Sequence, residues 1–224
     1  MKKVIGSFVR TALAVVTLAG SQFAMADIGA GSQVKFADGP GSGTGGAFNV
    51  SVVAGAGLGE SFQSFCLEKT EYLDFSSTFY VKSVTGATTS AGTPDPLGDQ
   101  AAWLFTQFTT NANSFFGSNL GAVGNTALQQ AIWTLEGEQL STSNALANTY
   151  INLANTATAG VNGWKNNGSV QVMNLFYDAN YSRHAQDQIY MVSSVPEPGT
   201  YGMMLIGAGL IGTIAARRRK NKNA

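Results

Sequence analysis

Apolar and polar residues alternate in the first part of the chain, between stretches rich in glycine. Val34 and Phe36 form one alternating pair, and Phe48, Val50 and Val52 form an alternating triplet. A period of two places every second side chain on the same face of a strand, so these residues predict two strands. The same pattern predicts further strands over residues 61–73, 77–84, 170–175 and 186–194, and a loop rich in Gly, Thr, Ser and Pro over 85–96.

In the middle of the chain the apolar residues recur with the period of a helix. Leu104, Phe105 and Phe108 follow this spacing, and Asn125 is the predicted N-cap of a second helical stretch. The three helices are predicted over residues 99–109, 125–138 and 143–157. Strands, a helical insert and further strands together predict an α+β fold, a β-sandwich or barrel with a three-helix insert packed at one side.

The start of the chain has the parts of a secretory signal peptide. Basic residues are followed by a short apolar run over residues 11–20, and residues 24–26, Ala-Met-Ala, form a small-x-small cleavage site. This arrangement predicts an N-terminal signal helix over residues 1–26 that is removed on export. An uncleaved anchor helix is the alternative, and the shortness of the apolar run argues against it.

The end of the chain also has three parts. An extended hinge comes first, because two prolines that bracket a glutamate continue neither a strand nor a helix. An uncharged segment over about 200–216 follows, which as a helix would be about 25 Å long, near the lower limit for crossing a membrane. A basic cluster ends it and would stay in the cytoplasm. The hinge consists of Val195, Pro196, Glu197 and Pro198, and the basic cluster contains Arg217, Arg218, Arg219 and Lys220.

This tripartite ending resembles the PEP-CTERM sorting signal of Gram-negative bacteria. The resemblance implies an exosortase, a membrane protease-transpeptidase, as processing partner and the inner membrane as a transient anchor. A plain C-terminal anchor is the alternative. The predicted organisation is a signal peptide over 1–26, a body outside the inner membrane over 27–194, and a sorting signal over 195–224 with a transmembrane helix. The protein is then expected at the cell surface or in the extracellular matrix.

The charges are segregated along the chain, although the 13 Lys and Arg balance the 13 Asp and Glu. Three cations precede residue 27 and five follow residue 216, so the part between them has five cations, all thirteen acids and a net charge of −8. An acidic body argues against binding to nucleic acid, which requires clustered Lys and Arg. The Asp residues do not follow the spacing of a calcium loop, so no metal site is predicted. No cofactor is predicted either.

The single cysteine, Cys66, lies in a predicted strand, and Gln129 lies in the sequence Gln-Gln-Ala-Ile-Trp of a predicted helix. A thiolate beside a Gln carboxamide can attack its carbonyl carbon and expel ammonia, which leaves an electrophilic internal thioester. The two segments resemble the thioester domains of bacterial surface adhesins, with Leu128 where the family has Thr. The resemblance implies that Cys66 and Gln129 form the thioester, with Gln130 as a second candidate.

These features predict a surface or matrix protein that is not an enzyme and that attaches through the thioester. Its candidate targets are surface amines, hydroxyls or exopolysaccharide. One alternative is a non-covalent structural or carbohydrate-binding module, in which Cys66 is a buried thiol. Another is a secreted hydrolase that uses Cys66 and the only histidine, His184.

Overall fold

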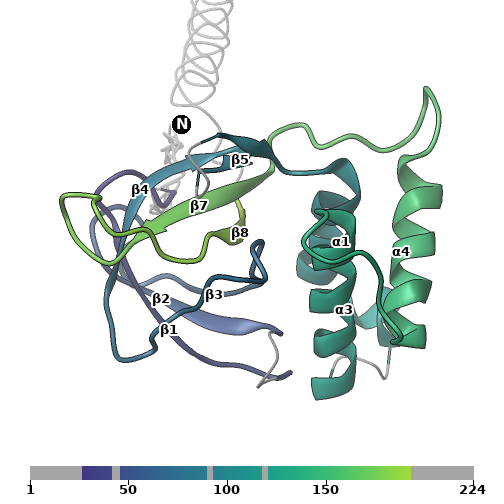
Figure 1. The fold of residues 1–224 in the computed structure, drawn as a ribbon, viewed down its shortest axis with the longest axis horizontal. Coiled ribbons are helices and arrows are strands. Elements are labelled where there is room, and N and C mark those ends of the chain that lie inside the picture. Colours follow the sequence, from purple (N-terminus) through teal and green to yellow (C-terminus); the bar gives the residue numbers. More distant parts are fainter. Residues whose placement is uncertain (1–26, 42–45, 90–92, 118–120, 193–224) are drawn as a thin grey trace, which may run out of the picture.

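One curled antiparallel sheet and a layer of helices beside it form the fold (Figure 1). The structure is a computed structural model that describes residues 27–41, 46–89, 93–117 and 121–192. In these ranges the strand order of the sheet is β3-β2-β1-β4-β7-β8. The strands are β1 (Gln33–Asp38), β2 (Phe48–Ala54), β3 (Ser61–Ser64), β4 (Phe79–Thr85), β7 (Val170–Phe176) and β8 (Gln188–Met191). Two further short strands, β5 (Ala87–Thr88) and β6 (Asp95–Pro96), pair with each other.

The helices form one continuous insert between β6 and β7, as the helical period of the sequence predicted. They are α1 (Asp99–Thr110), α2 (Ala112–Phe115), α3 (Ala122–Leu135) and α4 (Ala145–Thr158). In Figure 1, α1, α3 and α4 stand next to one another on one side of the sheet. The mixed α/β class predicted from the sequence is therefore confirmed, while the six strands belong to one curled sheet and not to the two sheets of a sandwich. The short helix α2 was not among the three predicted helices, and the predicted loop over 85–96 contains β5 and β6.

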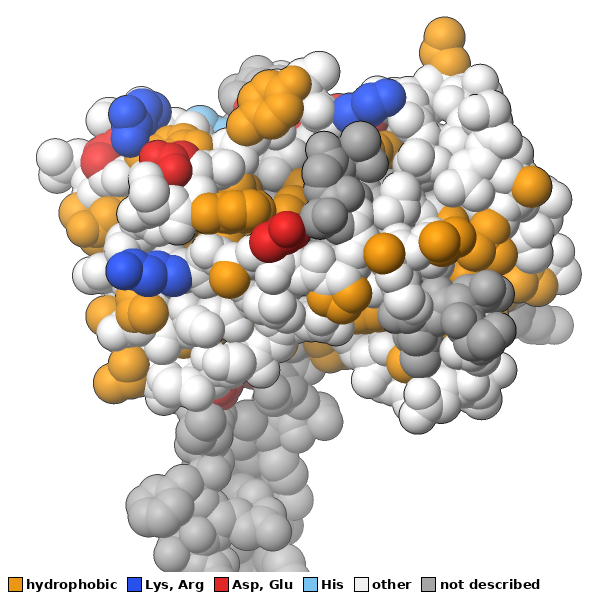
Figure 2. Space-filling view, turned by 90° about the horizontal axis from the view of Figure 1, so that it is seen from below, with side chains coloured by type: hydrophobic (Ala, Val, Ile, Leu, Met, Phe, Trp, Pro, Cys, Tyr) orange, Lys and Arg blue, Asp and Glu red, His pale blue; other side chains and the backbone are white. Residues whose placement is uncertain are grey.

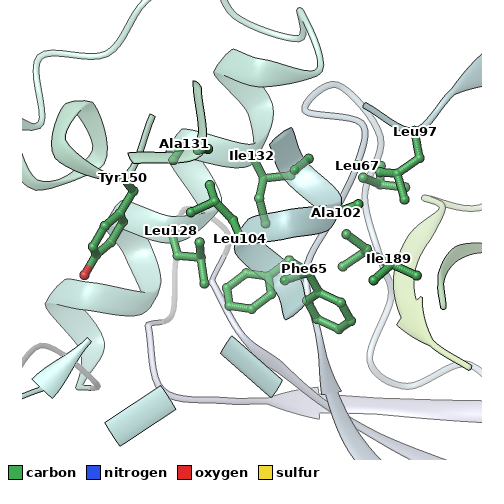
Figure 3. Packing of buried hydrophobic residues seen from close by; sticks show 14 of the residues in the cluster. Phe65, Leu67, Leu97, Ala102, Leu104, Leu128, Ala131, Ile132, Tyr150 and Ile189 are labelled. Carbon is green, nitrogen blue, oxygen red and sulfur yellow. The ribbon is translucent and has the colours of Figure 1, made fainter. Parts of the chain in front are cut away.

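Strand β7 divides the core, because its two faces contact two different hydrophobic clusters. Val170 and Val172 pack with the helices, whereas Met173 and Leu175 pack with the apolar faces of β1, β2 and β4. Alternate side chains of a strand point to opposite faces, so one apolar strand can serve both clusters. The helix-side cluster is drawn in Figure 3, where Leu128 and Ile132 of α3 lie among residues from α1, α4 and the sheet.

The edges of the curled sheet meet next to β3. The strand predicted over 61–73 ends at Ser64, and the following residues leave β2 and run beside β8 instead. The Ile189 N–H donates to the Phe65 carbonyl at 3.1 Å, and the Leu67 N–H donates to the Asp187 carbonyl at 3.1 Å. The prediction was wrong here because strand periodicity does not indicate which neighbour a segment pairs with.

The predicted N-cap of the second helix was also wrong. α3 begins at Ala122 with Gly121 as its N-cap, and Asn125 is buried within the helix. Asn144 instead caps α4, where its side chain accepts hydrogen bonds from the N–H groups of Leu146 and Ala147.

Within the described ranges, no helix has the length and apolar character needed to cross a membrane. The predicted signal helix over 1–26 and the predicted transmembrane helix over about 200–216 lie outside the residues that the structure describes.

The helix-side cluster is expected to contribute strongly to stability. Ile132 is fully buried in α3, so Ile132→Ala should lower the free energy of unfolding by about 2–5 kcal/mol through lost burial and the cavity left behind. Val123 in the same helix is 72% exposed, so Val123→Ala should change it by no more than about 0.5 kcal/mol. Urea unfolding followed by circular dichroism measures both, and equal losses would contradict the assigned core.

Candidate functional site

Cys66 lies where the two edges of the sheet meet, between two residues that face the helices. The rings of Phe65 and Phe108 are 5.0 Å apart, and Leu67 belongs to the same helix-side cluster (Figure 3). Since neighbouring side chains of an extended segment point in opposite directions, the Cys66 thiol faces away from the helices. Cys66 is buried and belongs to neither hydrophobic cluster, and its backbone forms an antiparallel β-bridge with that of Gln188.

Gln129 reaches from α3 to the main chain of Cys66. Its side-chain Oε1 accepts a hydrogen bond from the Cys66 N–H at 2.9 Å, and its Nε2 donates to the Cys66 carbonyl at 2.8 Å. Gln129 is fully buried, so both bonds are shielded from water. The structure thus brings together the two residues that the sequence paired, but it joins them through the backbone of Cys66 and not through the thiol.

The thiol instead contacts Gln186. Its Sγ donates a hydrogen bond to Gln186 Oε1 at 2.8 Å, and Gln188 Nε2 lies 3.5 Å from the same oxygen. Gln186 Nε2 donates to the carbonyls of Glu68 and Glu71 at 2.6 and 2.7 Å. The Gln186 carboxamide is therefore held at both its oxygen and its nitrogen, directly against the sulfur.

The thiol is protonated at neutral pH. Burial raises the pKa of the Cys66 thiol to about 12; the hydrogen bond with Gln188 lowers it, and the nearby Glu68 carboxylate raises it further. A thiol with such a pKa is a poor free nucleophile towards reagents in solution. Reaction with a carboxamide already in contact depends instead on proximity and on moving the thiol proton within the site.

Buried carboxylates fix the segment that carries Gln186. Glu68 accepts a hydrogen bond from the Asp187 N–H at 2.8 Å. Asp187 is fully buried and accepts from the N–H groups of Leu175 and Thr89 at 2.9 and 3.1 Å. These bonds tie the segment before β8 to β7 and to the chain after Leu67, so the carboxamide is placed by rigid neighbours.

His184 lies between two carboxylates at the rim of this arrangement. Its Nδ1 is 2.9 Å from Glu71 Oε2, and its Nε2 is 3.3 Å from Asp187 Oδ1. Burial alone lowers the pKa of His184, but the hydrogen bonds and charges of Asp187 and Glu71 outweigh it and raise that pKa to about 9. The ring is thus an imidazolium at neutral pH and links the two segments that hold Gln186.

A pocket of about 640 Å³ opens onto both Cys66 and Gln186. Aromatic rings and carboxamides form most of its wall, which comprises Asp38, Phe48, Lys69, Glu71, Tyr72, Leu73, Phe75, Gln130, Trp133 and Gln139. A larger pocket of about 840 Å³ lies between β3, β8 and α1, and Cys66 is not part of its wall. Cys66, Gln186 and the smaller pocket therefore define the candidate site.

Sequence reasoning missed Gln186. Its strand was predicted from alternation over 186–194, and the two glutamines at 186 and 188 were treated as ordinary strand residues. Both are buried, which is unusual for Gln, but burial of a polar side chain cannot be read from a period of two. Gln130, the second candidate, lines the pocket and accepts a hydrogen bond from the Thr142 hydroxyl at 3.1 Å.

The hydrolase alternative can also be placed in the structure. Both ring nitrogens of His184 face carboxylates, and no described hydrogen bond links His184 to Cys66. Among the described residues, no group of three or more His, Cys, Asp and Glu side chains is arranged to hold a metal ion.

Comparison with known proteins identifies the C-terminal segment. Residues 194–220 match the family model of the PEP-CTERM protein-sorting motif. No curated protein and no solved structure matches the chain. The chain thus carries a PEP-CTERM sorting motif, which implies export, processing by an exosortase and membrane-anchored sorting to the cell surface.

The His184 link predicts how stability depends on pH. The pKa of His184 in the folded protein, about 9, lies above its ordinary value of 6.5. The stabilisation that charged His184 gives the folded state is therefore complete below about pH 6.5 and is lost as the pH rises towards 9. The loss should be at most about 3 kcal/mol, at roughly 1.4 kcal/mol per pKa unit. Urea unfolding at pH 6 and pH 10 measures it.

His184→Gln is the matched variant, because it keeps a polar side chain but cannot titrate. Its free energy of unfolding should fall less than that of the wild type between pH 6 and pH 10. An identical fall in both proteins would assign the pH dependence to other groups.

Proposed function

We propose that the exported body attaches covalently to surface material through an internal thioester between Cys66 and Gln186. The single observation that supports this pairing is the 2.8 Å contact between the Cys66 sulfur and the Gln186 carboxamide oxygen. Gln129 then has a positioning role, because both ends of its carboxamide are occupied by the backbone of Cys66. The proposal keeps the chemistry predicted from the sequence and changes the acyl partner.

The reaction needs no cofactor. The Cys66 sulfur attacks the side-chain carbonyl carbon of Gln186, the C–N bond breaks, and ammonia leaves with the thiol proton. The new bond is a thioester between Sγ of Cys66 and the former carboxamide carbon. Since Cys66 is 2% and Gln186 4% exposed, water has little access to the product, and slow hydrolysis is a condition for storing an electrophile.

The attachment is a single event without turnover. A nucleophile on another surface enters the pocket, attacks the thioester carbonyl and displaces the Cys66 thiolate, which takes up a proton. The raised pKa of the Cys66 thiol favours the protonated product once the bond has opened. A protein of this kind acts outside the cell, in agreement with the sorting motif at 194–220.

Mass spectrometry tests the thioester and its partner. The exported mature protein should be lighter by about 17 Da, the mass of ammonia, than the mass calculated for its processed sequence, and methylamine should open the thioester to an N-methyl amide. Peptide mapping of the wild type should find this label, about 14 Da heavier than Gln, on Gln186.

Three variants separate the glutamines. Gln186→Ala should abolish both the mass loss and the label, whereas Gln171→Ala, in β7 and outside the wall of the pocket, should retain them. Gln129→Ala should lower the fraction that forms the thioester, with the label still on Gln186. A label on Gln129 would restore the pairing predicted from the sequence, and an unmodified mass with no methylamine adduct in the wild type would overturn the thioester.

The sorting motif has its own test. Replacement of Pro196, Glu197 and Pro198 by Ala should leave the body in the membrane fraction with its tail uncut, because the extended segment that the processing enzyme reads is lost. Ser193→Ala, just outside the matched segment, should be processed normally. Cell fractionation with intact-mass measurement reports both, and normal processing of the triple variant would contradict the role of these residues.

A further inference from the structure

The pocket beside Cys66 and Gln186 indicates what kind of nucleophile the proposed thioester receives. We propose that the acceptor is a carbohydrate and that a sugar hydroxyl opens the thioester to form an ester. This inference rests on the proposed function and adds the class of target. It follows from the aromatic side chains, the charges and the carboxamides around the pocket.

Two exposed aromatic rings stand at the pocket. Tyr72 is 80% and Phe75 43% exposed, and in the described part of the chain they are the only aromatic residues among the exposed large hydrophobic side chains. Both line the pocket that reaches Cys66. Exposed aromatic surface gathered at one pocket marks a binding surface, since every other aromatic ring in the described ranges is buried or half-buried.

The segment that carries these rings is held in place before any ligand arrives. The Tyr177 hydroxyl donates a hydrogen bond to the Tyr72 carbonyl at 2.8 Å. The rings of Phe75 and Phe48 pack edge to face, with their centres 5.5 Å apart. Asp74 accepts hydrogen bonds from the hydroxyls of Ser76 and Ser77. A preformed aromatic wall loses little conformational entropy on binding.

The charges of the pocket do not favour a cation. The charged residues in its wall are Asp38, Lys69 and Glu71, and the Glu71 carboxylate is already paired with the His184 imidazolium. Lys69 Nζ hydrogen-bonds to Gln139 at 2.8 Å and lies 5.8 Å from the centre of the Trp133 ring. Lys69 therefore occupies the face of Trp133, the kind of ring that attracts an ammonium group most strongly.

A carbohydrate fits this combination of groups. A sugar ring has apolar C–H faces that pack on aromatic rings, and hydroxyls at its edge that exchange hydrogen bonds with a carboxamide such as that of Gln130. On the face shown in Figure 2, uncharged polar side chains and backbone predominate over charged side chains. A neutral polymer can approach such a surface without displacing ion pairs.

The step balances without another reactant. The sugar oxygen bonds to the acyl carbon of Gln186, the C–S bond breaks, and the hydroxyl proton ends on the sulfur of Cys66. The products are an ester between the sugar and the Gln186 side chain, and a free Cys66 thiol.

Adduct formation with defined probes tests the inference. The exported mature protein is incubated with maltohexaose, cellohexaose, Nα-acetyl-lysine or methylamine, and intact mass is followed over time. Methylamine reports whether the thioester exists and is small enough to need no aromatic contact. We expect an adduct with at least one hexasaccharide, lost after mild alkaline hydroxylamine because an ester, unlike an amide, is cleaved by it.

Tyr72→Ala and Phe75→Ala distinguish recognition from reactivity. Each should slow the hexasaccharide reaction about tenfold, the size expected for loss of an aromatic contact, and leave the methylamine rate within about twofold. Leu58→Ala removes a large apolar side chain that is 62% exposed and not part of the pocket, and should change neither rate.

The outcomes separate the two proposals. A methylamine adduct without any hexasaccharide adduct would overturn the carbohydrate acceptor and leave the thioester intact. Faster reaction with Nα-acetyl-lysine that is slowed by Tyr72→Ala would likewise overturn it in favour of an amine acceptor. Failure of methylamine itself would overturn the proposed function.

Discussion

The pairing of residues 65–67 with residues 187–189 is the constraint on which the rest of the structure depends. It joins the two edges of a curled sheet, and it places Cys66 opposite Gln188 and beside Gln186. Backbone hydrogen bonds hold both segments, so the sulfur and the carboxamide are kept together by the fold itself and not by flexible side chains. A shift of one residue in this register would turn the Cys66 thiol towards the helices.

The helices support this junction from one side. Phe65 and Leu67 anchor the segment in the helix-side cluster, and Gln129 occupies both backbone hydrogen-bonding groups of the cysteine between them. A buried carboxamide that bonds to a main chain acts as an extra strand neighbour at a place where the sheet has none. Packing against α1 and hydrogen bonding from α3 thus fix the same short segment. The thiol is left to face the pocket.

Much of this architecture could be predicted from the sequence. The alternation around Val34 and Val50 and the helical spacing around Leu104 depend on local geometry, so the strands at these residues and the helical insert were predicted correctly. The edge switch at Phe65 could not be predicted, because pairing partners depend on the register of strands far apart in the chain. Gln129 was singled out by a sequence motif, whereas Gln186 was known only as a residue of a predicted strand. Neither a motif nor a predicted strand indicates which carboxamide contacts the Cys66 sulfur.

The sequence by itself determined the destination of the protein and the kinds of side chain available for its chemistry. The sorting motif at 194–220, the segregation of charge and the single cysteine are properties of the chain as written, and they need no folding to be read. Only the tertiary structure decided which glutamine contacts the thiol and which rings surround it. Contact between side chains more than a hundred residues apart depends on strand register and burial, and these arise from the packing of the whole sheet.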